Sequence, residues 1–199
     1  MIFRKILCVY WLAVITACSN IQFKEPQPTN GIVLTKIPEH LNGKYVLQSN
    51  LGFFKARKRE KKNRNLLFDT LIIESDIIRI VGQDHLNVKI EEDNYRSILK
   101  QYCDTCYSLS IQGFQGVQGD SSLWEVMSLH FSQNSLDIYQ NIVPTSSQYR
   151  SSEKFRNICK YDSFRVEKST YYTLHPTPEQ FEQLINQDVY TLVKYKKVP

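Results

Sequence analysis

Short apolar runs with a two-residue period are the feature that most constrains how this chain can fold. In the run from His85 to Glu91, the apolar residues Leu86, Val88 and Ile90 alternate with polar ones. Successive side chains of a β-strand point to opposite faces, whereas a helix needs its apolar residues three or four positions apart. The run therefore predicts a strand with one face on a hydrophobic core.

Two longer stretches have the form of β-hairpins. Residues 65–81 and residues 123–139 each contain an apolar run, a polar bend and an apolar return. Adjacent runs of this kind pair as antiparallel strands. Together with the other short runs they predict an all-β fold, mainly an antiparallel meander that forms a barrel or a sandwich.

One segment near the C-terminus has a helical pattern instead. Thr177 suits the N-cap position, Pro178 the first helical position and Glu179 the first turn. Apolar residues then recur at helical spacing before Asn186 can end the helix, and they are Phe181, Leu184 and Ile185. A short C-terminal helix is therefore expected, followed by a last strand over residues 189–195.

The stretch over residues 41–47 resembles the first strand of lipocalin-like envelope lipoproteins. Gly43 stands two positions before the aromatic residue Tyr45, where that family usually has tryptophan. The resemblance implies a barrel whose floor is closed by the aromatic ring. A barrel of about eight strands could hold one small apolar ligand. No ligand-binding residue of the family is carried over to this chain.

The N-terminus has the composition of a secretory signal. Arg4 and Lys5 form a basic start, and the twelve residues from Ile6 to Ala17 are mostly apolar. A membrane-spanning helix needs about 20 apolar residues, so this run is too short to span. An ordinary signal has small residues around its cleavage site, which Ile15 does not fit. The residue that follows the run is Cys18.

Residues 15–18 resemble the lipobox of bacterial lipoproteins. This resemblance implies cleavage before Cys18, a diacylglyceryl group with palmitate-like chains on its sulfur, and attachment to the cell envelope. One acyl chain binds a membrane marginally, whereas two hold a protein stably. Ser19 follows, not the aspartate that retains such proteins at the inner membrane of enteric bacteria. By analogy, the outer membrane is favoured, with the domain in the periplasm.

Three regions are expected along the 199 residues. Residues 1–17 are a signal peptide, residues 18–35 are the lipidated cysteine and a flexible tether, and residues 36–199 are a single β-rich domain. The tether is expected because residues 19–35 have little hydrophobic periodicity and contain Pro26 and Pro28. Prolines stiffen such a spacer.

Three cysteines remain once Cys8 and Cys18 are accounted for, and Cys103, Cys106 and Cys159 are the candidates for one disulfide in an oxidising compartment. The two-residue gap between Cys103 and Cys106 also occurs in redox and zinc sites. A redox pair would sit at the start of a helix, and zinc would need a second ligand pair. The flanking runs predict strands instead, with the pair near a hairpin bend.

A basic run is the strongest local charge feature of this chain, whose net charge is +5. Such a run is a solvated hairpin loop or a contact for anionic head groups, worth about 1 kcal/mol per residue. Nucleic acid is not an expected partner of an envelope lipoprotein. The candidate anionic-surface residues are Lys55, Arg57, Lys58, Arg59, Lys61, Lys62 and Arg64.

No motif of an enzyme, cofactor or metal site is present. The glycines of residues 113–119 lack dinucleotide or P-loop spacing. His130 is expected on one strand face with Trp124, Val126 and Ser128, as a partly buried side chain. We therefore expect a ligand-binding or structural domain with no metal or cofactor, whose partner is a small apolar ligand or an envelope protein.

The alternative is an envelope hydrolase with a dispersed active site. An internal apolar cavity would favour ligand binding. A polar cleft that joins a nucleophile to a histidine would favour the enzyme. A flat aromatic patch would favour assembly with another protein.

Overall fold

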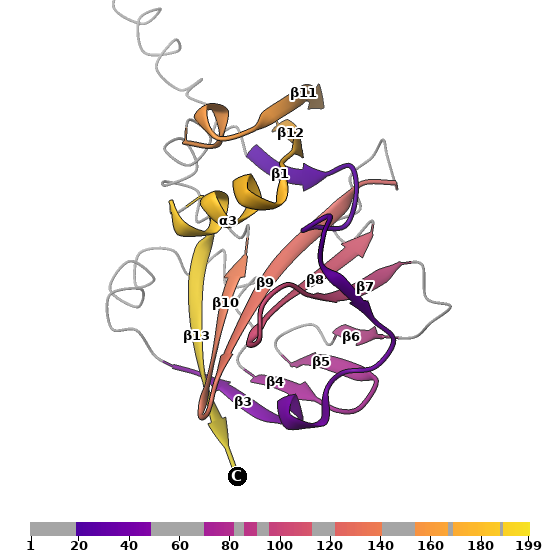
Figure 1. Ribbon diagram of the computed structural model, residues 1–199, viewed down its shortest axis with the longest axis vertical. Coiled ribbons are helices and arrows are strands. Elements are labelled where there is room, and N and C mark those ends of the chain that lie inside the picture. The colour runs from indigo at the N-terminus through magenta and orange to yellow at the C-terminus, as the bar shows by residue number, and fades with distance from the viewer. Residues whose placement is uncertain are drawn as a thin grey trace, which may run out of the picture.

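The computed structural model describes residues 19–48, 70–81, 86–90, 96–112, 122–140, 154–166, 169–187 and 189–199. The predicted fold class is confirmed, because these residues form a mostly antiparallel β-structure with one short helix near the C-terminus (Figure 1). Four predicted features lie outside the described residues, and they are the signal peptide over residues 1–17, Cys18, the basic run over residues 55–64 and the glycine-rich residues 113–119.

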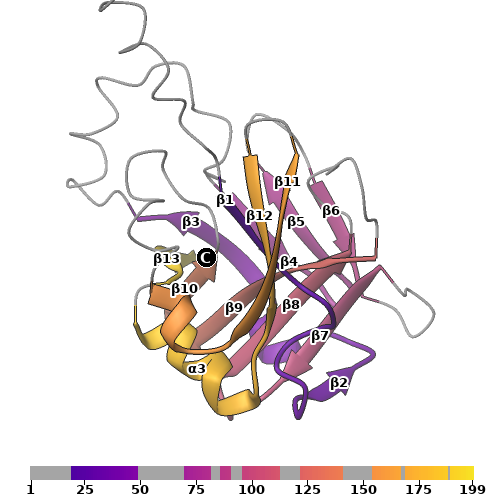
Figure 2. The same cartoon turned by 90° about the horizontal axis from the view of Figure 1, so that it is seen from above.

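The main sheet is strongly curled, like half of a barrel (Figures 1 and 2). Among the described residues its neighbours follow the order β6-β5-β4-β3-β13-β10-β9-β8-β7-β2, and each adjacent pair is antiparallel. The strands are β2 (Ile32–Leu34), β3 (Gly43–Leu47), β4 (Thr70–Ile73), β5 (Ile77–Val81), β6 (Leu86–Lys89), β7 (Ser97–Gln101), β8 (Cys106–Gln112), β9 (Trp124–Ser132), β10 (Ser135–Gln140) and β13 (Thr191–Val198).

Three further strands branch from the start of β9. The strand β1 (Ser19–Phe23) meets β9 where Phe23 pairs with Trp124, and it runs parallel to β12 (Ser169–His175). The outermost strand, β11 (Lys160–Val166), is antiparallel to β12. This branch and the helix α3 (Pro178–Asn186) lie at one end of the molecule (Figure 1). Two short 3-10 turns, η2 (Glu39–Leu41) and η3 (Phe155–Asn157), complete the described elements.

Strand β9 is shared by two hydrophobic cores because its side chains alternate between the two faces of the sheet. Leu129 and Phe131 belong to the core inside the curl. Trp124 and Val126 belong to a second core on the outer face, under α3 and the branch strands. A single strand therefore connects the curled sheet to its covering layer.

Aromatic residues fill the centre of the curl. Tyr45 is 2% exposed, and its hydroxyl donates a hydrogen bond to the Leu41 carbonyl at 2.8 Å. The Phe131 ring lies edge-on to Tyr45 at 5.9 Å and to Tyr107 at 5.6 Å. Gly43 begins the strand at φ 153°, a conformation that favours glycine. The resemblance of this stretch to lipocalin-like proteins stays a prediction.

Helix α3 begins and ends where the sequence predicts. The Thr177 side chain accepts a hydrogen bond from the Gln180 amide, and the Gln180 side chain accepts one from the Thr177 amide. This reciprocal capping box satisfies two backbone donors at the helix start. The three apolar residues Phe181, Leu184 and Ile185 are all buried, so the helix covers the second core with one face.

The expectation of a flexible tether over residues 18–35 is wrong for its described part, residues 19–35. Residues 19–23 form β1, in which Ile21 and Phe23 are buried in the second core. Residues 32–34 form β2, which pairs with β7. Only two apolar side chains anchor β1, which is why periodicity did not reveal it. The described part of the domain therefore already includes Ser19.

The segment between β1 and β2 is also held against the sheet. The buried Lys100 ammonium donates hydrogen bonds to the carbonyls of Pro26 and Pro28, each at 2.9 Å. The Ser108 hydroxyl donates to the Gln27 carbonyl. The prolines expected in a spacer therefore provide carbonyl groups that bind a buried cation. Residues 24–31 are part of the domain.

Candidate functional site

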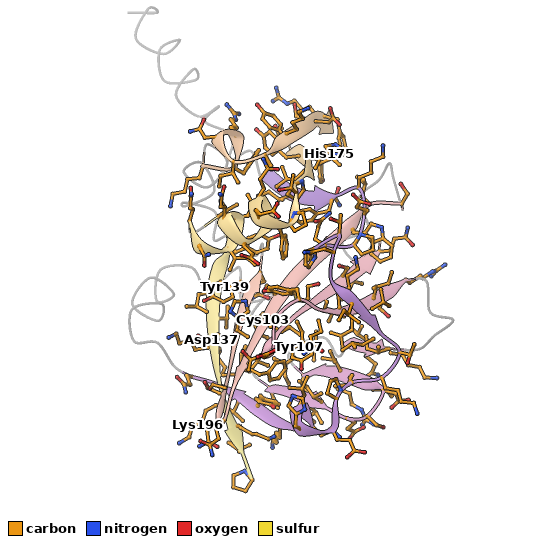
Figure 3. All side chains as sticks on the ribbon, in the orientation of Figure 1. Cys103, Tyr107, Asp137, Tyr139, His175 and Lys196 are labelled. Carbon is orange, nitrogen blue, oxygen red and sulfur yellow. A yellow bond between two sulfur atoms is a disulfide. The ribbon has the colours of Figure 1, made fainter. Side chains whose placement is uncertain are left out.

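An open groove of about 720 Å³ lies beside the branch strands. Its walls come from η3, the start of β11, the end of β12 and the first turn of α3, and the lining includes Arg156, Asn157, Lys160, Tyr161, His175 and Gln180. Figure 3 shows His175 in this end region. The groove is formed by segments that are close in sequence but belong to four different elements.

An aromatic cluster supports the arginine of the groove. The Tyr161 and Tyr172 rings lie 5.8 Å apart, and each packs edge-on against the buried Phe155. The Arg156 guanidinium lies 5.9 Å from the Tyr161 ring centre and 6.0 Å from that of Tyr172, in reach of cation–π attraction. It also donates to the Tyr172 hydroxyl at 3.4 Å. These contacts hold the guanidinium in place before any ligand arrives.

A histidine and a carboxylate face each other across the β11–β12 pair. His175 Nε2 lies 2.8 Å from Asp162 Oδ2, although Asp162 is largely exposed. Lys160 pairs with His175 in the strand register and is exposed. Among the described lining residues, two permanently cationic side chains, Arg156 and Lys160, stand with one carboxylate, Asp162, which pairs with His175. Cationic side chains of this kind suit an anionic ligand.

Cys159 lies at the base of the same groove, 6% exposed and unpaired. Burial raises the pKa of its thiol to about 11, although a hydrogen bond with the His175 backbone lowers it. The thiol is therefore protonated at neutral pH, and the thiolate is the nucleophilic form. The groove brings a cysteine and a histidine together without activating the cysteine.

A second polar cluster lies on the outer face of β9, on the face where the alternation predicts His130. The Tyr102 hydroxyl is 2.5 Å from Ser128 Oγ and 2.7 Å from His130 Nε2, and these last two atoms are 2.9 Å apart. Burial lowers the pKa of His130, against the opposing charge of Asp137, and raises the pKa of Tyr102 to about 12. Ser128 is 0% exposed, so a substrate has no access to its hydroxyl. The cluster satisfies buried polar groups under α3.

The structure joins Cys103 to Cys106 in a disulfide and leaves Cys159 as a free thiol. The pair closes the turn between β7 and β8, where the flanking patterns predict a bend. Figure 3 labels Cys103 at mid-height of the molecule and His175, which lines the groove, near its upper end. No helix starts at this pair, which is the context that a thioredoxin-like site requires.

Within the described ranges, no group of three or more histidine, cysteine, aspartate or glutamate side chains could hold a metal ion. Among the same residues, no helix is both long and apolar enough to cross a membrane. Neither Cys18 nor the seven candidate residues of the basic run can be placed, because they lie outside these ranges.

Comparison with known proteins gives no relative: no protein family, no curated protein and no solved structure matches this chain. The properties of the site therefore rest on its own geometry.

The carboxyl group of Glu125, inside the curl, allows the effect of burial on stability to be measured. Glu125 pairs with Ile111 on the face that carries Leu129, and burial raises its pKa from 4.5 to about 7. The unfolded chain releases this proton at a lower pH than the folded chain. The charged form therefore destabilises the fold, and stability is lost as the pH rises from about 4.5 to about 7.

We expect the variant Glu125→Gln to unfold at higher urea concentration than the parent at pH 8. The expected gain is on the order of 2 kcal/mol, which is the pKa shift expressed as free energy with a discount for partial exposure. At pH 4 the two proteins should unfold alike, because the parent carboxyl is then neutral when folded. Glu39→Gln, at an exposed position, is the control for losing a charge. An equal gain at both pH values would contradict this explanation.

Proposed function

We propose that this protein is a lipid-anchored binding module of the bacterial cell envelope, and that its open groove takes a small acidic sugar. The observation that carries the proposal is the groove beside β11, which Arg156 and Lys160 line and in which the Arg156 guanidinium lies over the Tyr161 and Tyr172 rings. The anchor is the lipid proposed on Cys18, which favours an outer-membrane location.

The chemistry of the groove fits a carboxylate on a hydroxyl-rich ring. A guanidinium binds a carboxylate through two parallel hydrogen bonds, and Arg156 is already held over Tyr161 and Tyr172. Preorganisation of this kind lowers the entropy lost on binding. The amide side chains of Asn157 and Gln180 add donors and acceptors for hydroxyl groups.

Two observations favour the outer groove over an apolar ligand inside the curl. Side chains at the centre of the described concave face are buried against one another, with Leu136 and Tyr195 at 0% exposure. The groove, in contrast, is open and is lined by the charged side chains Arg156, Lys160 and Asp162. An apolar ligand would need the space that these core residues occupy.

Binding is favoured over catalysis at this site. A hydrolase of the Cys-His or Ser-His type needs a nucleophile that is both activated and accessible. Cys159 is protonated at neutral pH, and Ser128 is fully buried. His175 and Asp162 then serve to shape the wall of the groove and orient a ligand.

The test is an isothermal titration calorimetry experiment in which the full protein is titrated with glucuronate and, separately, with glucose. Glucuronate should bind at a single site, and glucose should bind at least tenfold more weakly because it lacks the carboxylate. Arg156→Gln should weaken glucuronate binding by about 10- to 100-fold, the value of a hydrogen bond to a charged group.

The matched control for that titration is Lys44→Gln, which removes an exposed cation on β3 outside the groove. It should leave glucuronate affinity unchanged. Equal losses in the two variants would mean that general charge attraction, and not the groove, binds the ligand. Absence of saturable binding would refute the proposed ligand class.

A further inference from the structure

The end of the branch strands that follows Cys18 in the sequence carries two aromatic residues and an arginine that do not line the proposed groove. Starting from the proposed lipid on Cys18, on which this inference rests, we propose that this end of β1, β12 and β11 lies on the bilayer surface. Phe164, Tyr171 and Arg165 then contact the lipid head groups. The partner is an anionic phospholipid surface.

The absence of a spacer brings the sheet to the membrane. Cys18 is directly bonded to Ser19, the first residue of β1, and adjacent Cα atoms are about 3.8 Å apart. The head-group region on each side of a bilayer is roughly 5–8 Å deep. A lipid on Cys18 therefore leaves the first residues of β1 at head-group level.

The strand register shows which residues of β12 and β11 lie level with the start of β1. Ser19 pairs with Thr170, which pairs with Arg165, and this is the first row that all three strands share; one further pair, Val166 with Ser169, lies beyond it. The second row runs from Asn20 through Tyr171 to Phe164. Neighbouring strands are about 4.8 Å apart, so Tyr171 and Phe164 lie about 5 and 10 Å from Asn20.

The side chains in these rows suit a membrane interface. The Phe164 and Tyr171 rings are stacked, with centroids 5.1 Å apart and an interplanar angle of 13°, and both are partly exposed. They project from the face opposite to Tyr172, which is buried in the second core. Aromatic rings concentrate at the head-group level of membranes. The partly exposed Phe164 ring would thus contact the head-group region.

Arg165 supplies the charge at the same sheet end. It is exposed and neighbours Phe164 along β11, so its side chain leaves the opposite face of the sheet. A cation at the membrane surface contributes about 1 kcal/mol on anionic lipid. The aromatic pair and the arginine would then contact head groups on both sides of the sheet end.

The groove lies at the other end of the same strands. Lys160 and His175 are opposite each other at the far end of the β11–β12 pair, five residues from Arg165 and Thr170. At about 3.3 Å per residue, this separation is about 17 Å. The long β11–β12 pair is seen in Figure 2. The proposed orientation therefore holds the groove clear of the lipid and open to the solvent.

The test places a fluorescent label at each end of this strand pair. Full-length lipidated protein with Thr170→Cys or Lys160→Cys is labelled and inserted into phosphatidylethanolamine–phosphatidylglycerol vesicles that contain a head-group spin label as quencher. The label at position 170 should be quenched at least twofold more strongly than the label at position 160. Equal quenching at both positions, in protein that floats with the vesicles, would overturn the inference.

Flotation separates this result from the proposed anchor. Protein that does not float with vesicles would refute the lipid on Cys18, and the membrane contact with it. In floating protein, Phe164→Ser with Tyr171→Ser should reduce quenching of the position-170 label at least twofold, because the lipid alone no longer fixes the orientation. Tyr171→Trp, which keeps an interfacial ring, should preserve the quenching. Unchanged quenching in the double serine variant would contradict a role for the aromatic pair.

Discussion

A Cys18→Ser variant is expected to lose all incorporated palmitate and to leave the detergent phase in Triton X-114 partition. The acyl groups of the proposed anchor are attached through the Cys18 sulfur, which serine lacks. Each buried methylene contributes about 0.8 kcal/mol, so two acyl chains outweigh every other membrane contact proposed for this protein. Alkyne-palmitate labelling of cells, followed by phase partition, measures both effects.

Cys8→Ser is the matched control, since Cys8 lies within the proposed signal segment, which the proposed cleavage before Cys18 would remove. That variant should keep its palmitate and its detergent partition. The lipoprotein assignment is wrong if the Cys18→Ser protein still incorporates palmitate or still partitions into detergent.

Phe181→Ala is expected to cost about 3–5 kcal/mol of unfolding free energy, the range for removing a large buried aromatic side chain. Phe181 is 0% exposed, and its ring packs edge-on against Phe23 and Tyr102, each at 6.2 Å. It also faces Tyr190 at 6.5 Å. Its loss would leave a cavity where α3 meets β1, and chemical denaturation measures the cost.

The control for this substitution is Gln183→Ala, an exposed position on the same helix. It should change stability by less than about 0.5 kcal/mol, because it removes no buried contact. Similar small effects in the two variants would mean that α3 contributes little to the second core.

The sequence predicted the elements whose patterns are local. The alternation in β9 correctly placed His130 on the face of Trp124 and Ser128, opposite to Leu129. The helix α3 was predicted because its cap and its apolar positions all lie within ten residues. Such elements can be predicted from the sequence, because the residues that determine their hydrogen bonds and their buried face lie close together in the chain.

The features that were missed depend on distant partners. Strand β1 pairs with β12 near the other end of the chain, and its five residues contain only two apolar side chains, Ile21 and Phe23. No periodicity can be read from two residues. The prolines after β1 indicated a spacer, but the buried Lys100 that binds their carbonyls is far away in the sequence.

The groove was missed for a related reason. Arg156, Lys160 and Asp162 stand in a polar segment with no motif, and Asp162 meets His175 only through the register of β11 and β12. The nearest available signal was the aromatic content of this segment, since Tyr161 and Tyr172 support Arg156. Sequence alone gave no reason to bring them together.

The parallel pairing of β1 has a consequence for the order of events during the proposed export. Ser19 pairs with Thr170, about 150 residues later, and contacts over such separations form slowly. A chain that emerges N-terminus first must therefore expose nearly all of its length before β1 can join the sheet. During that interval the residues of β1, which directly follow Cys18 in the sequence, remain unpaired. We expect the lipid to be attached first, so that the protein completes its fold on the membrane.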